Sequence, residues 1–390
     1  MLQTSIFLQI APEDSFFCFI FIQSKKQIMK TIVLSLFFSI FVFSLLNAQN
    51  NNVQEIIQQG VELHDAAEYK KAIEKYQEAL KIDPKSNQAV YEMSLSYLQL
   101  KDYKKASEYS TKVINSNNKE LSVGAYAVKS EALAEMDMID EAIQLLKDGL
   151  QRNGDEYLLH FNLALNYYKK RDLDNALTHV KRAIDLDKTH SGAYLLYAYT
   201  LNSKKYWVQS IFSFQMFLLL EPDSQRSKNA FEEMLQTMRV KPASEKPVER
   251  SFIQQQLMRN QGENNQNASE IPPLSIVDGL NRNFVYSAIT HTLDSLTQIS
   301  ENENLYICFK EVNEAILKVL EKENNSSKEG IFWNFYVPFF SYIANSEYYD
   351  IYCRYISSSY FPESLAWWKN NPNKARNFIR WFEKGDNPDT

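Results

Sequence analysis

The sequence predicts an all-α protein, with an array of about five helix pairs in its first half and an aromatic-rich helical module in its second half. Three observations support this fold class. Only 9 glycines and 11 prolines occur among 390 residues, whereas loop-rich β folds and glycine-cradle nucleotide folds need glycine where φ is positive. One pattern of small residues recurs at a fixed period through the first half. Apolar residues follow helical spacing in the second half.

Composition excludes several classes of function. Hydrophobic residues make up 45% of the chain, which is ample for a core. A net charge of −6 gives no basic face for nucleic acid, so no nucleic-acid partner is expected. Three cysteines are too few for a disulfide framework or a multi-cysteine zinc site.

The first 48 residues have the pattern of an export signal. Three lysines flank an uncharged apolar run over residues 31–46, and Asn47-Ala48-Gln49 follows. A basic flank, a short apolar run and a small residue are typical of a secretory signal peptide. The run is shorter than the ~20 residues that cross a bilayer comfortably.

These features predict an exported protein, periplasmic or secreted after signal cleavage near Ala48. Met29 directly precedes the basic residue Lys30, so it is the expected true start, and residues 1–28 are an upstream extension. In the alternative, residues 31–48 remain uncleaved and anchor the chain in a membrane, which would be its only contact with a membrane.

A repeat with a period of about 34 residues organises positions 53–224. Small residues occupy an early position of each unit: Ala72, Ala106, Ala142, Ala176 and Ser210. The small residues that precede them in the same units keep the same register: Gly60, Ser94, Ser130, Ala164 and Ala198. Two helices that cross closely need a small residue at the crossing point. Unrelated amphipathic helices would not keep this register five times.

These residues, with Pro84 and Pro222 closing two of the units, resemble the tetratricopeptide repeat, whose unit is a pair of antiparallel helices. The resemblance implies a right-handed α-solenoid with units 53–86, 87–120, 123–156, 157–190 and 191–224. The step from the second unit to the third is longer than the others, and this two-residue slip at Leu121–Ser122 is expected in a loop. The fifth unit departs most, with Ser210 and Phe217 at positions that are usually alanine, which predicts packing against something bulky. Residues 225–240 are expected to form a capping helix.

The chain beyond residue 240 divides into a linker and a second module. Residues 241–273 are polar and rich in proline signals, as in a coiled linker. Residues 274–390 return to helical spacing, and 18 Phe, Trp and Tyr fall between Phe332 and Phe382. A helical core of aromatics is one interpretation, and an exposed aromatic surface for a partner or glycan is the other. The module is similar to the C-terminal extensions of exported bacterial tetratricopeptide proteins.

No catalytic or metal motif stands out, so the chain is predicted not to be an enzyme and to need no cofactor or metal. There is no HExxH, GxSxG, GxxxxGK[ST] or GxGxxG pattern. His160, His179 and His190 share one repeat but fall on different helices and loops, so they are expected to be ordinary core or solvated histidines. Cys308 and Cys353 look like packing thiols, and the sequence leaves open whether they form a bridge.

The remaining candidate site is the groove that the first helices of such repeats line. Its expected partner-binding residues are Tyr91, Leu95, Phe161, Asn162, Tyr168 and Tyr199. The other groove positions hold Gln54, Ile57, Val61, Glu92, Leu98, Glu131, Leu165 and Leu195. The family's carboxylate clamp needs Lys, Asn and Arg, and only Asn162 and Lys169 are present, so a clamp is not expected. The aromatic side chains either anchor a partner or pack between helices, and the chain's own linker or C-terminal module could fill the groove.

The resulting prediction is a non-catalytic protein–protein interaction scaffold of a bacterial cell envelope, which binds a peptide or helix in the solenoid groove. One alternative is an enzyme or enzyme-accessory protein with its site in the C-terminal module. Another is a membrane-anchored structural protein. The sequence does not identify the partner, which is expected to be a protein or peptide.

Overall fold

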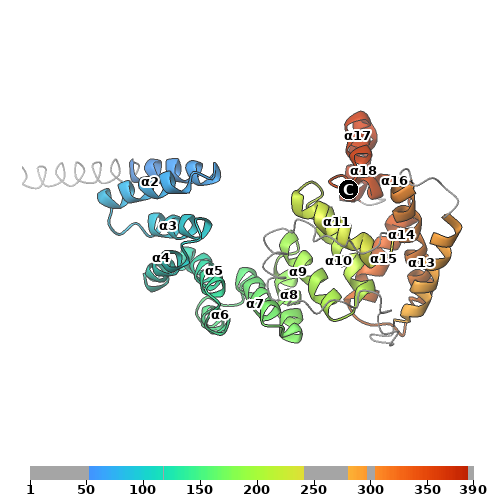
Figure 1. The fold of residues 1–390 in the computed structure, drawn as a ribbon, viewed down its shortest axis with the longest axis horizontal. Helices are drawn as coiled ribbons and strands as arrows, with labels where there is room; N and C mark the ends of the chain where they lie inside the picture. The colour runs from blue at the N-terminus through green and yellow to red at the C-terminus, as the bar shows by residue number, and fades with distance from the viewer. Residues whose placement is uncertain (1–51, 117, 241–279, 297–303, 385–390) are drawn as a thin grey trace, which may run out of the picture. The chain divides into compact units, whose positions relative to one another are not determined.

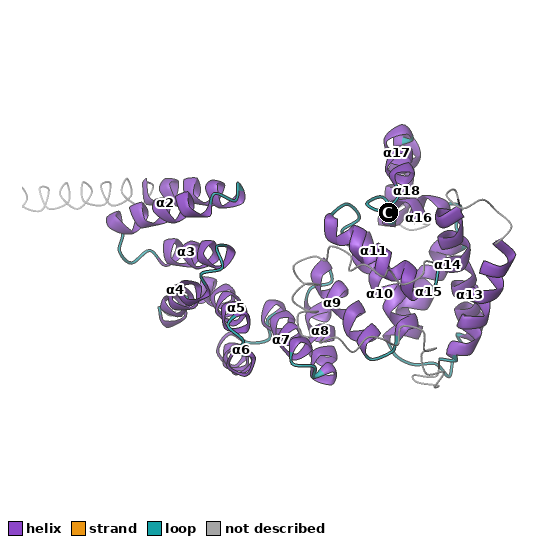
Figure 2. Ribbon diagram, viewed as in Figure 1, coloured by secondary structure: helices purple, strands orange, loops and turns teal. Residues whose placement is uncertain are grey.

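The computed structural model describes residues 52–116, 118–240, 280–296 and 304–384. The expected signal segment and polar linker lie outside these residues. Contacts between Cα atoms divide the chain into two compact units, residues 1–121 and 122–390, which are described separately. Helices joined by short turns dominate both units (Figure 2), so the predicted all-α class is confirmed.

None of the helices in the described ranges is both long and apolar enough to cross a bilayer.

The first unit is a stack of paired helices. A helix over residues 52–65 is followed by α2 (Tyr69–Ile82), α3 (Asn87–Gln99) and α4 (Tyr103–Asn115). The predicted small positions lie at the helix crossings, where Ala72 and Ala106 are fully buried. Gly60 packs so closely on Tyr76 that a Cβ atom there would lie 2.4 Å from the ring.

The second unit continues the same pattern with further pairs. Its array helices are α5 (Lys119–Glu135), α6 (Ile139–Asn153), α7 (Tyr157–Lys169), α8 (Leu173–Leu186), α9 (Ser191–Ser203), α10 (Trp207–Leu220) and α11 (Gln225–Thr237). Successive helices pack on each other, most extensively α7 on α8 and α9 on α10 (Figure 1). Ala142, Ala176 and Ser210 are fully buried at these crossings.

One turn geometry recurs after every first helix. The residue that ends the turn has a positive φ, between 59° and 68°, at Ala67, Lys101, Asp137, Arg171, Lys205 and Arg239. The next backbone N–H bonds to a carbonyl five residues earlier, for example Tyr206 N–H to Leu201 O at 2.8 Å. This is a Schellman-type end, which satisfies the last carbonyls of the helix. The spacings along the chain between these positive-φ residues equal those between the small residues at the helix crossings. The sixth such turn follows α11.

The expectation that the slip at Leu121–Ser122 lies in a loop is wrong. Both residues belong to the first turn of α5, which begins at Lys119. The extra residues therefore lengthen a helix at its N-terminus, because a helix can grow there without disturbing the crossing set by Ser130 and Ala142. Asn118 supports this early start, since its side-chain oxygen accepts the N–H of Leu121 at 3.1 Å.

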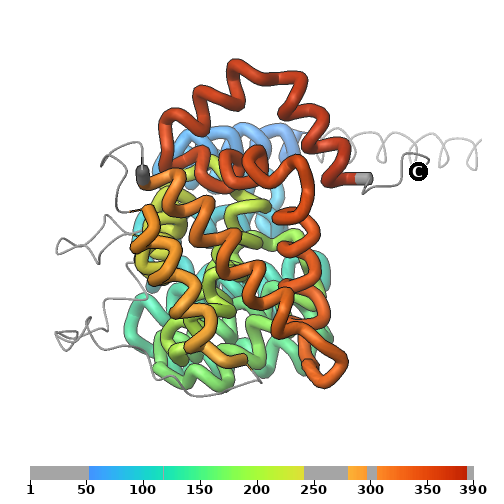
Figure 3. Tube along the Cα trace, turned by 90° about the vertical axis from the view of Figure 1, so that its right-hand side faces the viewer, coloured from blue at the N-terminus to red at the C-terminus, as the bar shows by residue number. Residues whose placement is uncertain are grey.

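The C-terminal module consists of helices of uneven length. It contains α13 (Arg282–Leu296), α14 (Asn304–Glu323), the π-helical segment η1 (Phe332–Tyr336), α15 (Val337–Ala344), α16 (Tyr349–Ile356), α17 (Pro362–Asn370) and α18 (Pro372–Lys384). In Figure 3 these orange and red helices lie over the yellow-green helices of the end of the array.

The module docks on α10 and α11. The Phe212 ring of α10 lies 5.3 Å from Phe340 and 5.8 Å from Phe332, measured between centroids. Buried polar groups satisfy one another across the contact: Gln215 Nε2 donates to Asn313 Oδ1 at 2.8 Å, and Tyr352 Oη donates to Gln215 Oε1 at 2.6 Å. The fifth repeat departs from the pattern because its second helix packs against this module.

Candidate partner-binding surface

In the first unit, two of the predicted contact residues are partly exposed. Tyr91 and Leu95 lie one turn apart on α3, and both are half-buried. Glu92, beside Tyr91, is also half-buried, and burial raises the pKa of its carboxyl, with the charge of Asp65 raising it further. Within the described residues Glu92 has neither a hydrogen bond nor an ion pair. This part of α3 therefore offers an apolar strip next to an unpaired carboxyl.

In the second unit, Phe161 is the predicted residue that keeps part of its ring exposed. It lies on α7 and meets the His190 ring edge-on, with 4.7 Å between centroids. His190 is itself fixed, because its Nδ1 accepts the N–H of Ala193 at 3.1 Å and caps α9. Phe161 is thus held against the N-terminus of the next first helix.

The other three predicted contact residues are buried. Asn162, Tyr168 and Tyr199 are 7%, 4% and 5% exposed. Asn162 Nδ2 donates to the Leu158 carbonyl at 2.8 Å, and the Tyr168 hydroxyl bonds to Ser203 Oγ at 2.8 Å. The Tyr199 ring packs edge-on against Phe214. Their positions match the interpretation in which groove aromatics pack between helices.

The remaining groove positions divide in the same way. Ile57, Leu98, Leu165 and Leu195 are buried, Val61 and Glu131 are half-buried, and Gln54 is exposed. Every large apolar residue of this group is at least half covered, because tightly stacked first helices bury the side chains between them.

Lys169 is engaged in an ion pair and could not grip a peptide carboxylate. Its Nζ lies 3.1 Å from Glu135 Oε1, and each side chain is only 6% exposed. Glu131, one turn before Glu135, has its pKa raised by burial, although the charge of Lys169 opposes this rise. The Lys169 cation therefore interacts with two acidic side chains of α5.

The structure joins two histidines that the sequence analysis treated as separate. His160 on α7 and His179 on α8 approach to 2.8 Å between their Nδ1 atoms, and His160 Nε2 lies 2.6 Å from Asp155 Oδ1. Burial lowers the pKa of His179 to about 4, and the positive charges of His160 and Lys147 add to the effect. Because the Asp155 carboxylate can only accept, His160 Nε2 is the donor in that contact.

The spacing of the two histidines along the chain matches none of the ligand motifs considered. The pair could be predicted from the sequence only by first placing the two antiparallel helices side by side in the right register. In the described ranges, no group of three or more His, Cys, Asp or Glu side chains is arranged to hold a metal ion.

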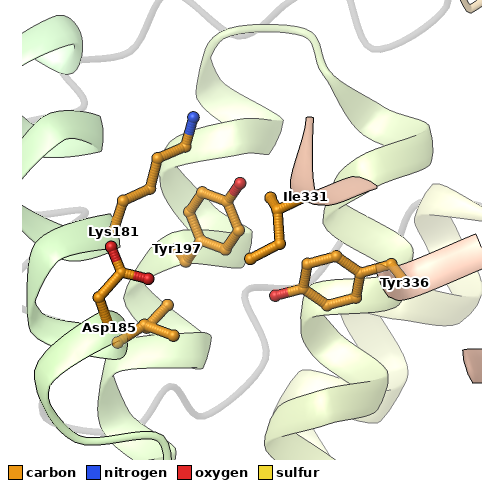
Figure 4. Close-up of a pocket in the computed structure, with 6 residues that line it drawn as sticks. Lys181, Asp185, Tyr197, Ile331 and Tyr336 are labelled. Carbon is orange, nitrogen blue, oxygen red and sulfur yellow. The ribbon is translucent and has the colours of Figure 1, made fainter. Parts of the chain in front are cut away.

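A small cavity of about 170 Å³ lies between α8, α9 and the η1 segment with the residue before it. Its lining residues are Lys181, Ile184, Asp185, Tyr197, Ile331 and Tyr336. Figure 4 shows the two tyrosine rings and Ile331 facing one another, with the Asp185 carboxylate nearby. Burial raises the pKa of Tyr336, so its hydroxyl stays protonated. The cavity could take one apolar side chain with a polar end.

The aromatics of the C-terminal module are mostly core. Trp333, Phe340 and Tyr352 are fully or almost fully buried, whereas a smaller group around Phe335 and Phe382 is exposed. Cys308 and Cys353 are thiols and do not form a disulfide. Burial raises the pKa of both thiols, which disfavours the thiolate that nucleophilic chemistry needs.

Comparison with known proteins places the repeats in a family. Tetratricopeptide repeat models match residues 88–120 and 130–191. A TPR repeat-containing protein of Methanocaldococcus jannaschii is 24% identical over 222 residues, which are 51% of this chain and 38% of the relative's length. The chain thus spans well under half of that relative.

Two solved structures illustrate the likeness. A thermophilic TPR protein of Thermus thermophilus has a TM-score of 0.43 at 21% identity, over 48% of this chain and 99% of that one. PilF of Pseudomonas aeruginosa has a TM-score of 0.42 at 18% identity, over 49% of this chain and 86% of that one. The matched segments, the small residues at the crossings and the helix pairs agree: the chain contains tetratricopeptide repeats.

Proposed function

We propose that the protein is a non-catalytic scaffold that binds a peptide or helical segment of a partner protein, and that the Tyr91–Leu95 strip of α3 is a principal contact. One observation carries the proposal. Tyr91 and Leu95 keep part of their surface exposed on a first helix, whereas Tyr168 and Tyr199 are covered. Large apolar side chains with partial exposure provide contact area at little cost in rotamer freedom.

The neighbouring carboxyls define the chemistry of the partner. Glu92 is half-buried without an ion pair among the described residues, and Asp65 adds a second negative charge close to it. A cationic group of the partner placed here would relieve the cost of burying the carboxylate. The expected ligand is therefore a segment with one large apolar side chain and a lysine or arginine near it.

Export is a separate part of the proposal and rests on the amino-acid pattern alone. The basic flank, the apolar run over 31–46 and Ala48 support a cleaved signal peptide and a role in the cell envelope. Mass spectrometry of the N-terminal peptide tests it. A mature terminus near Gln49 is expected, and an intact Met29 or Met1 terminus in a membrane fraction contradicts it.

The binding surface can be tested with a defined probe, a displayed library of random dodecapeptides selected against the full chain. Peptides that pair an apolar residue with Lys or Arg should be enriched. Tyr91→Ala and Leu95→Ala should each weaken the selected peptides by about tenfold, since contact residues of this kind typically contribute about 1 kcal/mol or more.

Tyr109→Ala is the matched control, because Tyr109 is also a half-buried tyrosine and lies on α4, the second helix of the same repeat. It should leave binding unchanged. If selected peptides bind the Tyr91→Ala and Leu95→Ala variants as tightly as the unaltered chain, α3 is not the contact surface.

A further inference from the structure

The end of the C-terminal module carries a contiguous exposed apolar surface. We call it the C-terminal aromatic patch and define it as Phe335, Phe339, Tyr342, Ile379, Trp381 and Phe382. Phe335, Tyr342, Ile379 and Phe382 are exposed, between 41% and 43% each. These four account for a large share of the exposed large hydrophobic residues in the described ranges, so apolar exposure is concentrated here.

Ring contacts join the patch across three elements, η1, α15 and α18. Phe335 stacks on Phe339 with 5.4 Å between centroids, and Phe339 meets Phe382 of α18 at 6.1 Å. Tyr342 of α15 stacks on Trp381 of α18 at 5.2 Å. Ile379 lies one turn from Phe382 on the same helix. The patch is therefore one surface and not a set of scattered side chains.

The helix that carries half of this patch is basic. Along α18, PNKARNFIRWFEK, four cationic residues occur with one carboxylate, although the whole chain has a net charge of −6. Lys374, Arg376 and Arg380 are exposed. In the described part of the chain none of these three forms an ion pair. Arg376 instead donates to the side-chain oxygen of Asn373 at 2.6 Å.

From this arrangement we infer that the C-terminal aromatic patch and the basic side of α18 dock on the surface of an anionic phospholipid bilayer. Charge complementarity selects this occupant, because unpaired cations beside exposed apolar rings gain from acidic headgroups and from the acyl boundary together. Trp and Tyr favour that depth because each has an apolar body and a polar edge. The helix lies on the bilayer and does not cross it. The inference is independent of the peptide surface proposed on α3.

The test uses the full chain and vesicles of phosphatidylcholine with or without phosphatidylglycerol. Bilayer contact is read from quenching of tryptophan fluorescence by lipids brominated in the acyl chain. Trp381 is the reporter: Trp207 and Trp333 are buried, and the Trp381→Phe variant supplies the background from the half-buried Trp367 and Trp368 of α17. Residues 31–46 contain no tryptophan, so insertion of that segment does not produce the signal.

Quenching is expected with phosphatidylglycerol and should weaken as salt is added. The double variant Arg376→Gln, Arg380→Gln should bind the phosphatidylglycerol vesicles about 30-fold more weakly. Each cation near an anionic surface raises the partition coefficient of the protein roughly fivefold. Ile379→Ser with Phe382→Ser should also abolish quenching, while a thermal melt verifies that each variant is folded.

Two matched controls remove similar groups elsewhere. Leu186→Ser with Leu220→Ser removes exposed apolar side chains from the array, and Lys85→Gln with Lys188→Gln removes exposed cations; neither should change quenching. The inference is overturned if the unaltered chain is not quenched, or if the α18 variants behave like these controls. Self-association through the patch without quenching would also overturn it, in favour of a contact between two copies of the chain.

Discussion

At the residue scale, the repeat is a set of close approaches that require small side chains. Gly60 lies against the Tyr76 ring, and an added Cβ would stand 2.4 Å from Cε1 and 2.8 Å from Cδ1. Tyr76 itself is fully buried, so the ring has little room to retreat. The sequence predicted that Gly60 lies at a close helix crossing, because steric need shows in residue size, but it did not predict that Tyr76 is the residue that Gly60 meets.

Gly60→Ala should therefore destabilise the first unit. Overpacking of this kind typically costs about 1–3 kcal/mol of unfolding free energy, and chemical denaturation measures it. Tyr76→Leu is the companion change, since it removes the ring that the new methyl group meets. The double variant should be less destabilised than the sum of the single variants; strict additivity would mean that Gly60 and Tyr76 do not oppose each other.

The pair of His160 and His179 lies beyond what residue types and spacing could predict. Their contact depends on the register of α7 against α8, and their separation in sequence has no meaning until those helices are paired. Burial then sets the chemistry, because it disfavours the charged imidazolium of His179.

The pKa of His179 gives a signed pH prediction. It is lowered from 6.5 to about 4, so between these values the unfolded chain binds a proton that the folded chain excludes. The free energy of unfolding should consequently fall as the pH drops through this window. His179→Gln should lose part of that acid sensitivity in thermal melts at pH 7 and about pH 4.5. His291→Gln, at an exposed position, is the control and should retain it.

At the element scale, the recurrent turn explains how the first helices end. Six turns adopt a positive φ at residues other than glycine, a backbone region in which Cβ crowds the following carbonyl oxygen. The sequence shows the period of these units but not the turn, because Ala, Lys, Asp and Arg do not signal a positive φ. The helical extension at Leu121–Ser122 was missed for a similar reason: no local residue distinguishes a longer helix from a longer loop.

Lys205→Gly should stabilise the turn between α9 and α10, where φ is 66°. Relief of the strained backbone should outweigh the extra freedom that glycine gives the unfolded chain, for a net gain of about 0.5–1 kcal/mol in unfolding free energy. Lys205→Ala removes the same side chain but keeps Cβ, so it should bring no gain. Equal effects of the two changes would trace the result to the lysine side chain and not to φ.

At the scale of the whole molecule, the array and the C-terminal module of the second unit share one core. Gln215 pairs with Asn313 across 98 residues of sequence and with Tyr352 across 137. Helical spacing predicted that residues 274–390 are helical but could not show where α13 and α14 dock, because such contacts join distant segments. Only Ser210 and Phe217, which depart from the repeat pattern, indicated locally that the fifth unit packs against another segment.

Ending the chain at residue 240 should therefore damage the array and not merely shorten it. Phe212, Phe214 and Gln215, all fully buried now, belong to the helix on which the module packs. The shortened chain should melt at a lower temperature and aggregate, since a large apolar face becomes exposed. Calorimetry and size-exclusion chromatography measure both effects. An unchanged melting temperature would show that the repeats are stable without the module.

The last array helix, α11, determines from which side this protein can gain repeats. Its turn matches those of the earlier first helices, yet the position that is small in the five units holds Glu232. Phe309 and Phe361 already occupy the Phe231 side of α11, at 4.9 and 5.6 Å between ring centroids. A new unit appended there would meet a long acidic side chain and displace two rings. A unit inserted between Leu186 and Ser191 would instead meet small residues on both sides. The array could therefore be lengthened by duplication of an internal unit but not by a unit added after α11.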